Sequence, residues 1–274
     1  MGLNVGILVV VGLLVGVVGG MFGVGGAIIL IPALTEVLGP NQHLYQSTAM
    51  IVNLFVAVPA VYQHRRANAI DFATVRRITP PAAAAVVLGV GVSEMGFFAG
   101  PGEAYLRGLF GLFLFASAAY DVYRLTRRRD PGQAPETKSP PLGWKALAAV
   151  AIPTGFASGL LGVGGGIIAV PLQRRFLHLP VRTAIANSAA IIVATSIVGA
   201  TFKNYAFLSS AGVDSHGQPL LLAAILVPTA VAGSLVGSHL THTVPVRFVK
   251  GAFVFLLLVA SVRLIQGALS TLPV

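Results

Sequence analysis

Long apolar runs dominate this sequence. Six of them approach the roughly 20 residues that a helix needs to cross the ~30 Å hydrocarbon core of a bilayer. They lie at 44–62, 78–98, 104–123, 181–202, 220–240 and 246–266. Only 9% of the residues are charged, against about 25% in soluble domains. Because such a chain lacks the polar surface of a water-soluble fold, it is predicted to be an all-α integral membrane protein.

Two further apolar runs, at 3–38 and 144–177, are interrupted by glycine clusters. The first reads "GMFGVGGAIILIPAL" from residue 20, and the second reads "GLLGVGGGIIAVPLQ" from residue 159. Glycine weakens a helix and proline kinks or ends it. A single helix over 3–38 would be about 54 Å long, too long for one crossing and too short for two. We therefore expect about eight hydrophobic segments in all, with a glycine-broken or re-entrant helix in each of these two runs.

The two halves of the chain resemble each other beyond the glycine clusters. The stretch "QSTAMIV" at 46–52 matches "ANSAAII" at 186–192, and similarity continues in order toward the end of each half. This indicates an internal duplication, and a polar, proline-rich stretch divides the copies. The expected organisation is a first transmembrane repeat at 1–123, a cytoplasmic linker at 124–143 and a second transmembrane repeat at 144–274.

The copies can run parallel or inverted across the membrane. A broken crossing at each glycine cluster gives parallel repeats, whereas a hairpin that returns to its starting side gives inverted repeats. Cytoplasmic loops are enriched in Lys and Arg. With the linker and the Arg65–Arg77 loop in the cytoplasm, inversion also places five cations inside, namely Arg174, Arg175, Arg182, Arg247 and Lys250. Arg107 opposes this choice. Inverted topology is favoured, and the parallel arrangement stays as the alternative.

The glycine clusters are also the candidate binding site. Backbone N–H groups can turn toward one point where glycine leaves out the side chain, and helices that begin near Gly26 and Gly165 leave their first N–H groups unpaired. Inside a bilayer such groups need a partner, and the positive end of a helix favours an anion. Hydroxyl and amide side chains after each cluster can add hydrogen bonds. The candidate binding residues are Gly23, Gly25, Gly26, Ala27, Ser47, Thr48, Asn53, Gly162, Gly164, Gly165, Gly166, Asn187 and Ser188.

Close helix packing is the alternative explanation for glycines in these runs. The pairs Gly16–Gly20, Gly155–Gly159 and Gly233–Gly237 fit the small-xxx-small pattern, and packing is the preferred interpretation for them. For the inner clusters a binding site is preferred. Packing alone does not require three glycines within four positions, followed by proline, in both halves.

Other classes of function find little support in the sequence. The net charge is +10, but the basic residues gather at the ends of apolar segments, so nucleic-acid binding is not expected. Without Cys there are no disulfides or thiolate metal sites, and the histidines form no metal-ligand set with carboxylates. No metal, cofactor or enzymatic activity is expected. Lys203 is expected to snorkel to the interface, and Arg263 lies inside the last apolar run without an evident partner.

The duplicated glycine clusters resemble those of the sulfite exporter family, TauE/SafE or TSUP. The resemblance covers nearly the whole chain and includes the "ST" and "NS" positions after each cluster and the "RRANAID" turn at 65–71. It implies a multi-pass carrier of sulfur-containing anions in a bacterial or archaeal plasma (inner) membrane. One departure is Ala27, which stands where the second copy has Gly166, so the first half of a site would be narrower or stiffer.

Together these observations predict a secondary transporter of small sulfur-containing anions (sulfite, sulfonate or a related organic anion), with export as the expected direction. Alternating access around a midplane site is the expected mechanism. An anion channel that uses the same glycine clusters as a filter is the alternative, and a membrane assembly subunit is a third class. The expected partners are the anion and the lipid bilayer. Proton or sodium coupling and a homodimer stay open.

Overall fold

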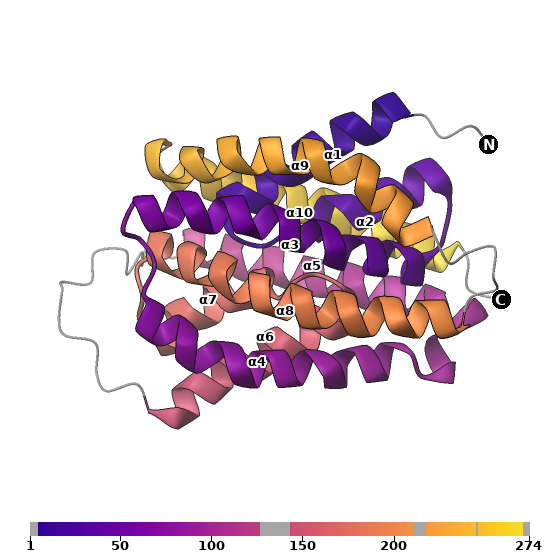
Figure 1. The fold of residues 1–274 in the computed structure, drawn as a ribbon, viewed down its shortest axis with the longest axis horizontal. Helices are drawn as coiled ribbons and strands as arrows, with labels where there is room; N and C mark the ends of the chain where they lie inside the picture. Colours follow the sequence, from indigo (N-terminus) through magenta and orange to yellow (C-terminus); the bar gives the residue numbers. More distant parts are fainter. Residues whose placement is uncertain (1–4, 127–142, 211–217, 245, 271–274) are drawn as a thin grey trace.

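The computed structural model describes residues 5–126, 143–210, 218–244 and 246–270, and these residues form helices with no β-strand among them (Figure 1). The first half contains α1 (Val5–Phe22), α2 (Ala27–Leu38), α3 (Gln42–Arg66), α4 (Phe72–Ser93), two short 3-10 turns (Gly96–Phe98 and Gly100–Gly102) and α5 (Glu103–Thr126). The second half contains α6 (Trp144–Leu161), α7 (Gly166–Phe176), α8 (Val181–Ser210), α9 (Gln218–Thr243) and α10 (Val246–Leu269).

Within the described ranges, six helices are long and apolar enough to cross a membrane: α1, α3, α4, α6, α8 and α9. The helices α5 and α10 cover the apolar runs predicted at 104–123 and 246–266. The prediction of an all-α integral membrane protein is confirmed. The helix α5 extends through Thr126, three residues into the predicted linker, and the remainder of that linker up to residue 142 lies outside the described residues.

Each glycine cluster forms a hairpin between a long helix and a short one. A Cβ on Gly26 would collide with Val15, which lies seven residues before the end of α1. A Cβ on Gly165 would meet Thr154, which lies seven residues before the end of α6. The chain therefore doubles back after each cluster, and α2 and α7 (12 and 11 residues) are about 16–18 Å long, half a bilayer.

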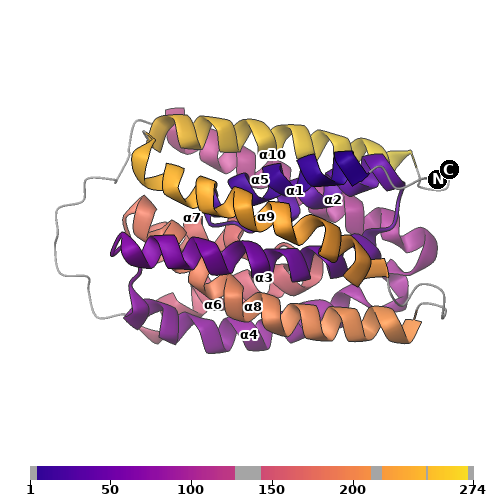
Figure 2. The ribbon, with the colours of Figure 1, turned by 45° about the horizontal axis from the view of Figure 1, so that its top comes forward.

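The two hairpins enter the bundle from opposite ends. In Figures 1 and 2 the α1–α2 hairpin opens toward the end where the N-terminus lies, and the α6–α7 hairpin opens toward the other end. The long helices α3, α4, α8 and α9 run along the whole bundle between those ends (Figure 1). The closed ends of the hairpins consequently lie inside the molecule.

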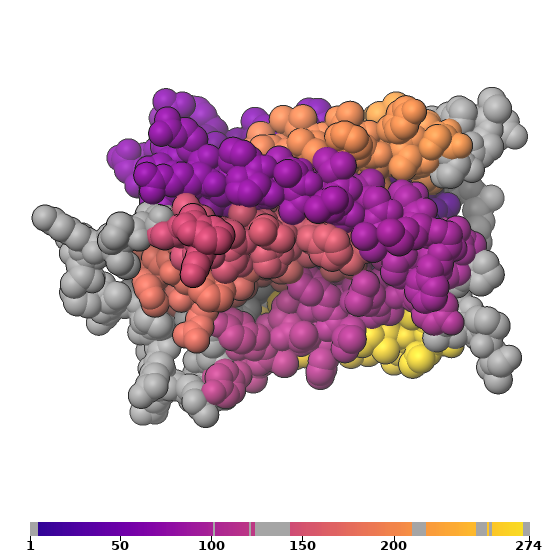
Figure 3. Space-filling model, turned by 90° about the horizontal axis from the view of Figure 1, so that it is seen from below, coloured from indigo at the N-terminus to yellow at the C-terminus, as the bar shows by residue number. Residues whose placement is uncertain are grey.

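Glycine-lined contacts join each hairpin to the opposite half of the chain. The helix α1 packs along α9, where a Cβ on Gly16 would strike the carbonyl of Ala230. The helix α6 packs along α4 (Figure 3), where a Cβ on Gly155 would strike the carbonyl of Ala82. The predicted packing role of these outer glycines is confirmed. The two halves interlock, because the long helix of each hairpin packs against the fourth helix of the other half.

Candidate functional site

The two glycine turns touch each other inside the bundle. A Cβ on Gly166 would collide with Val24 and with the carbonyl of Gly23, and one on Gly25 would lie 3.2 Å from the carbonyl oxygen of Val163. Val24 and Val163 are 2% and 1% exposed. The turns therefore meet at one buried point that receives backbone from both halves.

Glycine is required by backbone conformation at this point. Gly25 and Gly164, at matching places in the two turns, have φ angles of +75° and +76°, in the left-handed region that side-chain-bearing residues rarely adopt. Both lie directly against Asn53. A larger residue would strain the backbone at both positions, and at Gly25 it would also collide with Asn53.

Asn53 ties the two turns together. Its Oδ1 accepts hydrogen bonds from the amides of Gly26 at 2.6 Å and Ala27 at 3.2 Å. Its Nδ2 donates to the carbonyl of Gly162 at 3.3 Å. The side chain is fully buried. Asn53 thus caps the start of α2, so those two amides already have a protein partner.

The start of α7 has no such cap. In the alignment of the two halves, Val193 takes the place of Asn53, and Gly165 and Gly166 match Gly26 and Ala27. Within the described part of the chain, no side chain accepts a hydrogen bond from the amides of Gly165 and Gly166, while the carbonyl of Gly165 accepts from Ile168 and Ala169. The two hairpins therefore share the same backbone course, but only the first has a polar side chain that caps its short helix.

The hydroxyl and amide residues predicted after each cluster divide into two groups. Ser188 joins the site, because its Oγ donates to the carbonyl of Gly23 at 2.6 Å. Asn187 points elsewhere and accepts from the amide of Asp71 at 2.8 Å, at the α3–α4 turn. Thr48 donates to the carbonyl of Leu44 in its own helix. Ser47 is buried, and its hydroxyl has no partner among the described residues.

Four further polar residues border the turns and were not predicted from the sequence. Gln46 donates to the carbonyl of Leu160 and packs against Gly162. Thr195 donates to the carbonyl of Gly164. Thr154 and Ser158, both on α6, pack against Gly165. The last two have an i, i+4 spacing that places them on one helix face, but their counterparts in the first half, Val15 and Gly19, are not polar, so the comparison of the halves obscured them.

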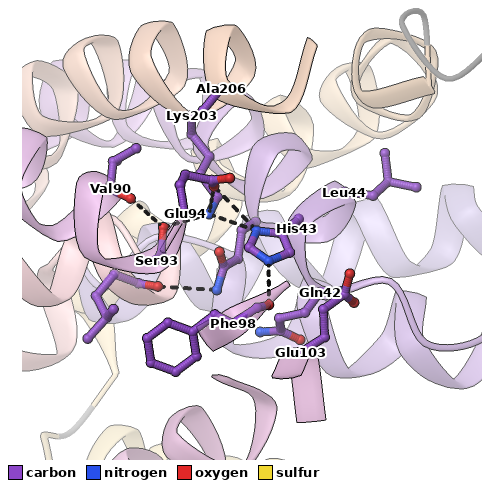
Figure 4. Close-up of polar contacts among 12 residues, drawn as sticks. Gln42, His43, Leu44, Val90, Ser93, Glu94, Phe98, Glu103, Lys203 and Ala206 are labelled. Atoms are coloured by element: carbon purple, nitrogen blue, oxygen red, sulfur yellow. Dashed lines mark hydrogen bonds and ion pairs between the residues drawn. The ribbon is translucent and has the colours of Figure 1, made fainter. Parts of the chain in front are cut away.

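A second polar cluster lies near the end of the bundle where the first hairpin opens (Figures 1 and 4). Lys203 of α8 forms an ion pair with Glu94, donates to Ser93 at 2.8 Å and lies 3.3 Å from His43 Nδ1. His43 Nε2 donates to the carbonyl of Phe98 at 3.0 Å. Lys203 is fully buried, so the expectation that it snorkels to the interface is wrong.

The ion pair keeps Glu94 charged. Burial alone raises the pKa of this carboxyl, but the hydrogen bond from His43 and the charge of Lys203 lower the pKa by more than burial raises it. The pKa therefore falls to about 2.

At the opposite end of the bundle, His64 of α3 and His242 of α9 approach to 2.9 Å between ring nitrogens. Each end thus carries a polar contact between helices of different halves.

Arg263 and Arg107, for which the sequence predicted no partner, each have a polar partner in the structure. Arg263 lies 3.7 Å from Glu36, and both side chains are exposed. Arg107 is 3% exposed and donates to the carbonyl of Gly267 near the end of α10 at 3.1 Å. Arg107 is therefore a helix-packing residue and not a free loop charge.

Comparison with known proteins gives one clear family. The family model described as "Sulfite exporter TauE/SafE" matches residues 8–264. The chain belongs to this family. It is accordingly a multi-pass membrane protein of the TauE/SafE family, and the resemblance noted in the sequence is confirmed.

Curated TauE/SafE relatives carry transporter names. The chain is 28% identical to "Probable membrane transporter protein MamO" of Paramagnetospirillum magneticum, over 90% of this chain and 42% of MamO. It is 26% identical to "Probable membrane transporter protein YjnA" of Bacillus subtilis, over 94% of this chain and 98% of YjnA. The chain spans about two fifths of MamO and nearly all of YjnA. No solved structure matches.

Proposed function

We propose that this TauE/SafE protein is a secondary transporter that exports a small sulfur-containing anion, such as sulfite, a sulfonate or a related organic anion, across the inner (plasma) membrane. The observation that carries the proposal is the buried contact between two helix-starting turns that reach the same point from opposite ends of the bundle. Half-helices whose N-termini point at an anionic group are a recurring transporter design.

The chemistry of the turns suits an anion that must also be released. The start of a helix carries about half a positive charge, and backbone N–H groups bind oxyanions by hydrogen bonds alone. The side chains of Asn53 and Ser188, which hydrogen-bond to the turns, are neutral. A site without a fixed cation holds its anion less tightly, which favours transport over storage.

The arrangement of the halves supports alternating access. The turns belong to different halves, and polar contacts join helices of different halves at both ends, through Lys203–Glu94 at one end and His64–His242 at the other. In the proposed cycle one end opens while the other stays closed, and one half moves against the other around the central turns.

Reconstitution tests the proposal. The purified full-length chain in liposomes is expected to give saturable uptake of radiolabelled sulfite or methanesulfonate, with acceleration by the same anion on the opposite side. An absence of flux for both sulfur anions, with sulfate and acetate as further probes, would contradict an anion carrier. Ion current far above carrier turnover would indicate a channel instead.

A charge placed between the turns supplies a sharper test. Asn53→Asp keeps one oxygen for the amides of Gly26 and Ala27 but turns a second oxygen toward the carbonyl of Gly162. The added negative charge repels an anion, so sulfite uptake is expected to fall more than about tenfold. Asn68→Asp, in the α3–α4 turn, is the matched control and should transport as the parent does.

A further inference from the structure

We propose that the anion is bound by the second hairpin alone, through the amides of Gly165 and Gly166 and the hydroxyls of Thr154 and Ser158, while the first hairpin is a structural support. This inference rests on the proposed anion transport. The ligand class is an oxyanion with several acceptor oxygens on one centre, as in sulfite or a sulfonate.

The difference between the hairpins is the first step. Asn53 Oδ1 accepts from the backbone amides of Gly26 and Ala27, and its Nδ2 donates to the carbonyl of Gly162. The side chain is buried. An anion would have to displace this cap to reach α2. The same two amide positions at α7 face no such competitor, because Val193 offers no polar atom.

Two orphaned hydroxyls beside the α7 start are the second and independent step. Thr154 and Ser158 are both 0% exposed, and neither hydroxyl has a hydrogen-bond partner among the described residues. A Cβ on Gly165 would lie 2.8 Å from Thr154 Cγ2 and 3.4 Å from Ser158 Cβ, so both residues pack against this turn. Burial of an unpaired hydroxyl is costly, and a bound acceptor would remove that cost.

Several other hydroxyls of this bundle donate within their own helices. Thr48, Ser117 and Thr201 each donate to the carbonyl four residues earlier. A helical serine or threonine has this option by geometry. That both Thr154 and Ser158 forgo it, on the one helix face that meets the uncapped turn, points to a ligand at this place.

The chemical character of the four groups selects the ligand. Two N–H groups donate and cannot accept, and two O–H groups can donate. They lie beside the positive end of a helix, which disfavours cations. An oxyanion can accept all four hydrogen bonds and carries the charge that the helix end favours, whereas a neutral molecule lacks that charge.

The test measures binding by purified full-length protein in detergent, as the thermal stabilisation produced by sulfite and, separately, by methanesulfonate. Thr154→Val and Ser158→Ala each remove one donor. Each is expected to weaken binding and so to raise the half-saturating concentration of the anion by about tenfold or more. Thr154→Ser, which keeps the hydroxyl, should stay close to the parent. Thr201→Val and Ser117→Ala are matched controls that lose a hydroxyl bonded within its own helix, and they should respond as the parent does.

The outcomes separate this inference from the proposed function. If the parent responds and Thr154→Val and Ser158→Ala respond equally well, the hydroxyls do not bind the anion and this inference is overturned while anion transport stands. If the parent responds to neither anion, the proposed function itself is contradicted. Should Thr154→Val not fold, Ser158→Ala decides alone, with its elution profile compared with that of Ser117→Ala.

Discussion

At the scale of single residues, Lys203 shows how tertiary contacts decide what a charge does. By sequence it ends an apolar run, where a lysine commonly reaches the interface. In the structure its ammonium group is enclosed by Glu94, Ser93 and His43, of which Glu94 lies 109 residues away. A charge inside a membrane protein is tolerated when it is paired, and here the pair joins α8 to the end of α4.

Removing one partner of this pair is expected to destabilise the protein. In Glu94→Gln, Lys203 stays buried without a counter-charge, which costs about 2–3 kcal/mol and lowers the melting temperature by several degrees. The double variant Glu94→Gln with Lys203→Met should recover part of the loss. Glu36→Gln removes the exposed partner of Arg263 and serves as the control, with a change under about 1 kcal/mol. Equal melting temperatures for parent and Glu94→Gln would contradict a structural ion pair.

The pKa of Glu94 sets the pH range of that contribution. Because the folded-state pKa of about 2 lies below the ordinary value of 4.5, the stabilisation is fully present above the ordinary value and is lost as the pH falls toward 2. The difference in melting temperature between parent and Glu94→Gln is therefore expected to stay constant from pH 8 to pH 5 and to shrink below about pH 4. Shrinkage between pH 7 and pH 5 would show that another group controls the pair.

At the scale of helices, the sequence predicts the elements better than their partners. The apolar runs, the interruption at each glycine cluster and the packing role of Gly16, Gly155 and Gly233 follow from local pattern and are found in the fold. The cap by Asn53 does not follow from it, because the amides it binds are 26 and 27 residues away and Gly162 is 109 residues away. Repeats in sequence suggest a symmetric site, and one asparagine makes the two hairpins chemically different.

The α4–α6 contact gives a test with a control in the same helix. A Cβ on Gly89 would strike the carbonyl of Phe156, whereas one on Gly91 meets nothing within 4 Å. Gly89→Ala is expected to force α4 and α6 apart. This should lower the free energy of unfolding by about 1–3 kcal/mol and lower the melting temperature clearly. Gly91→Ala should leave it unchanged or raise it slightly, since alanine favours helix by up to about 1 kcal/mol. Similar losses in both variants would mean that backbone flexibility, and not packing, is what glycine supplies here.

At the scale of the whole molecule, the distribution of basic residues indicates which end of the bundle faces the cytoplasm. The α3–α4 turn, the α7–α8 turn and the start of α10 all lie at the end of the bundle toward which the α6–α7 hairpin opens (Figure 1). The cations at 65–77, 174–182 and 247–250 belong to these segments. An excess of Lys and Arg marks the cytoplasmic side. Because Arg107 is buried against α10, it weighs little against this orientation.

Single cysteines can test the orientation directly, since the chain has none of its own. Arg175→Cys, at the exposed end of α7, is expected to be shielded from a membrane-impermeant thiol reagent in intact cells and to react after permeabilisation. Phe97→Cys, 66% exposed in the α4–α5 connection, is expected to react in intact cells. Both substituted positions are exposed in the fold, so a difference in labelling reports the side of the membrane and not burial. Ready labelling of Arg175→Cys in intact cells would place this end of the bundle outside and contradict the proposed orientation.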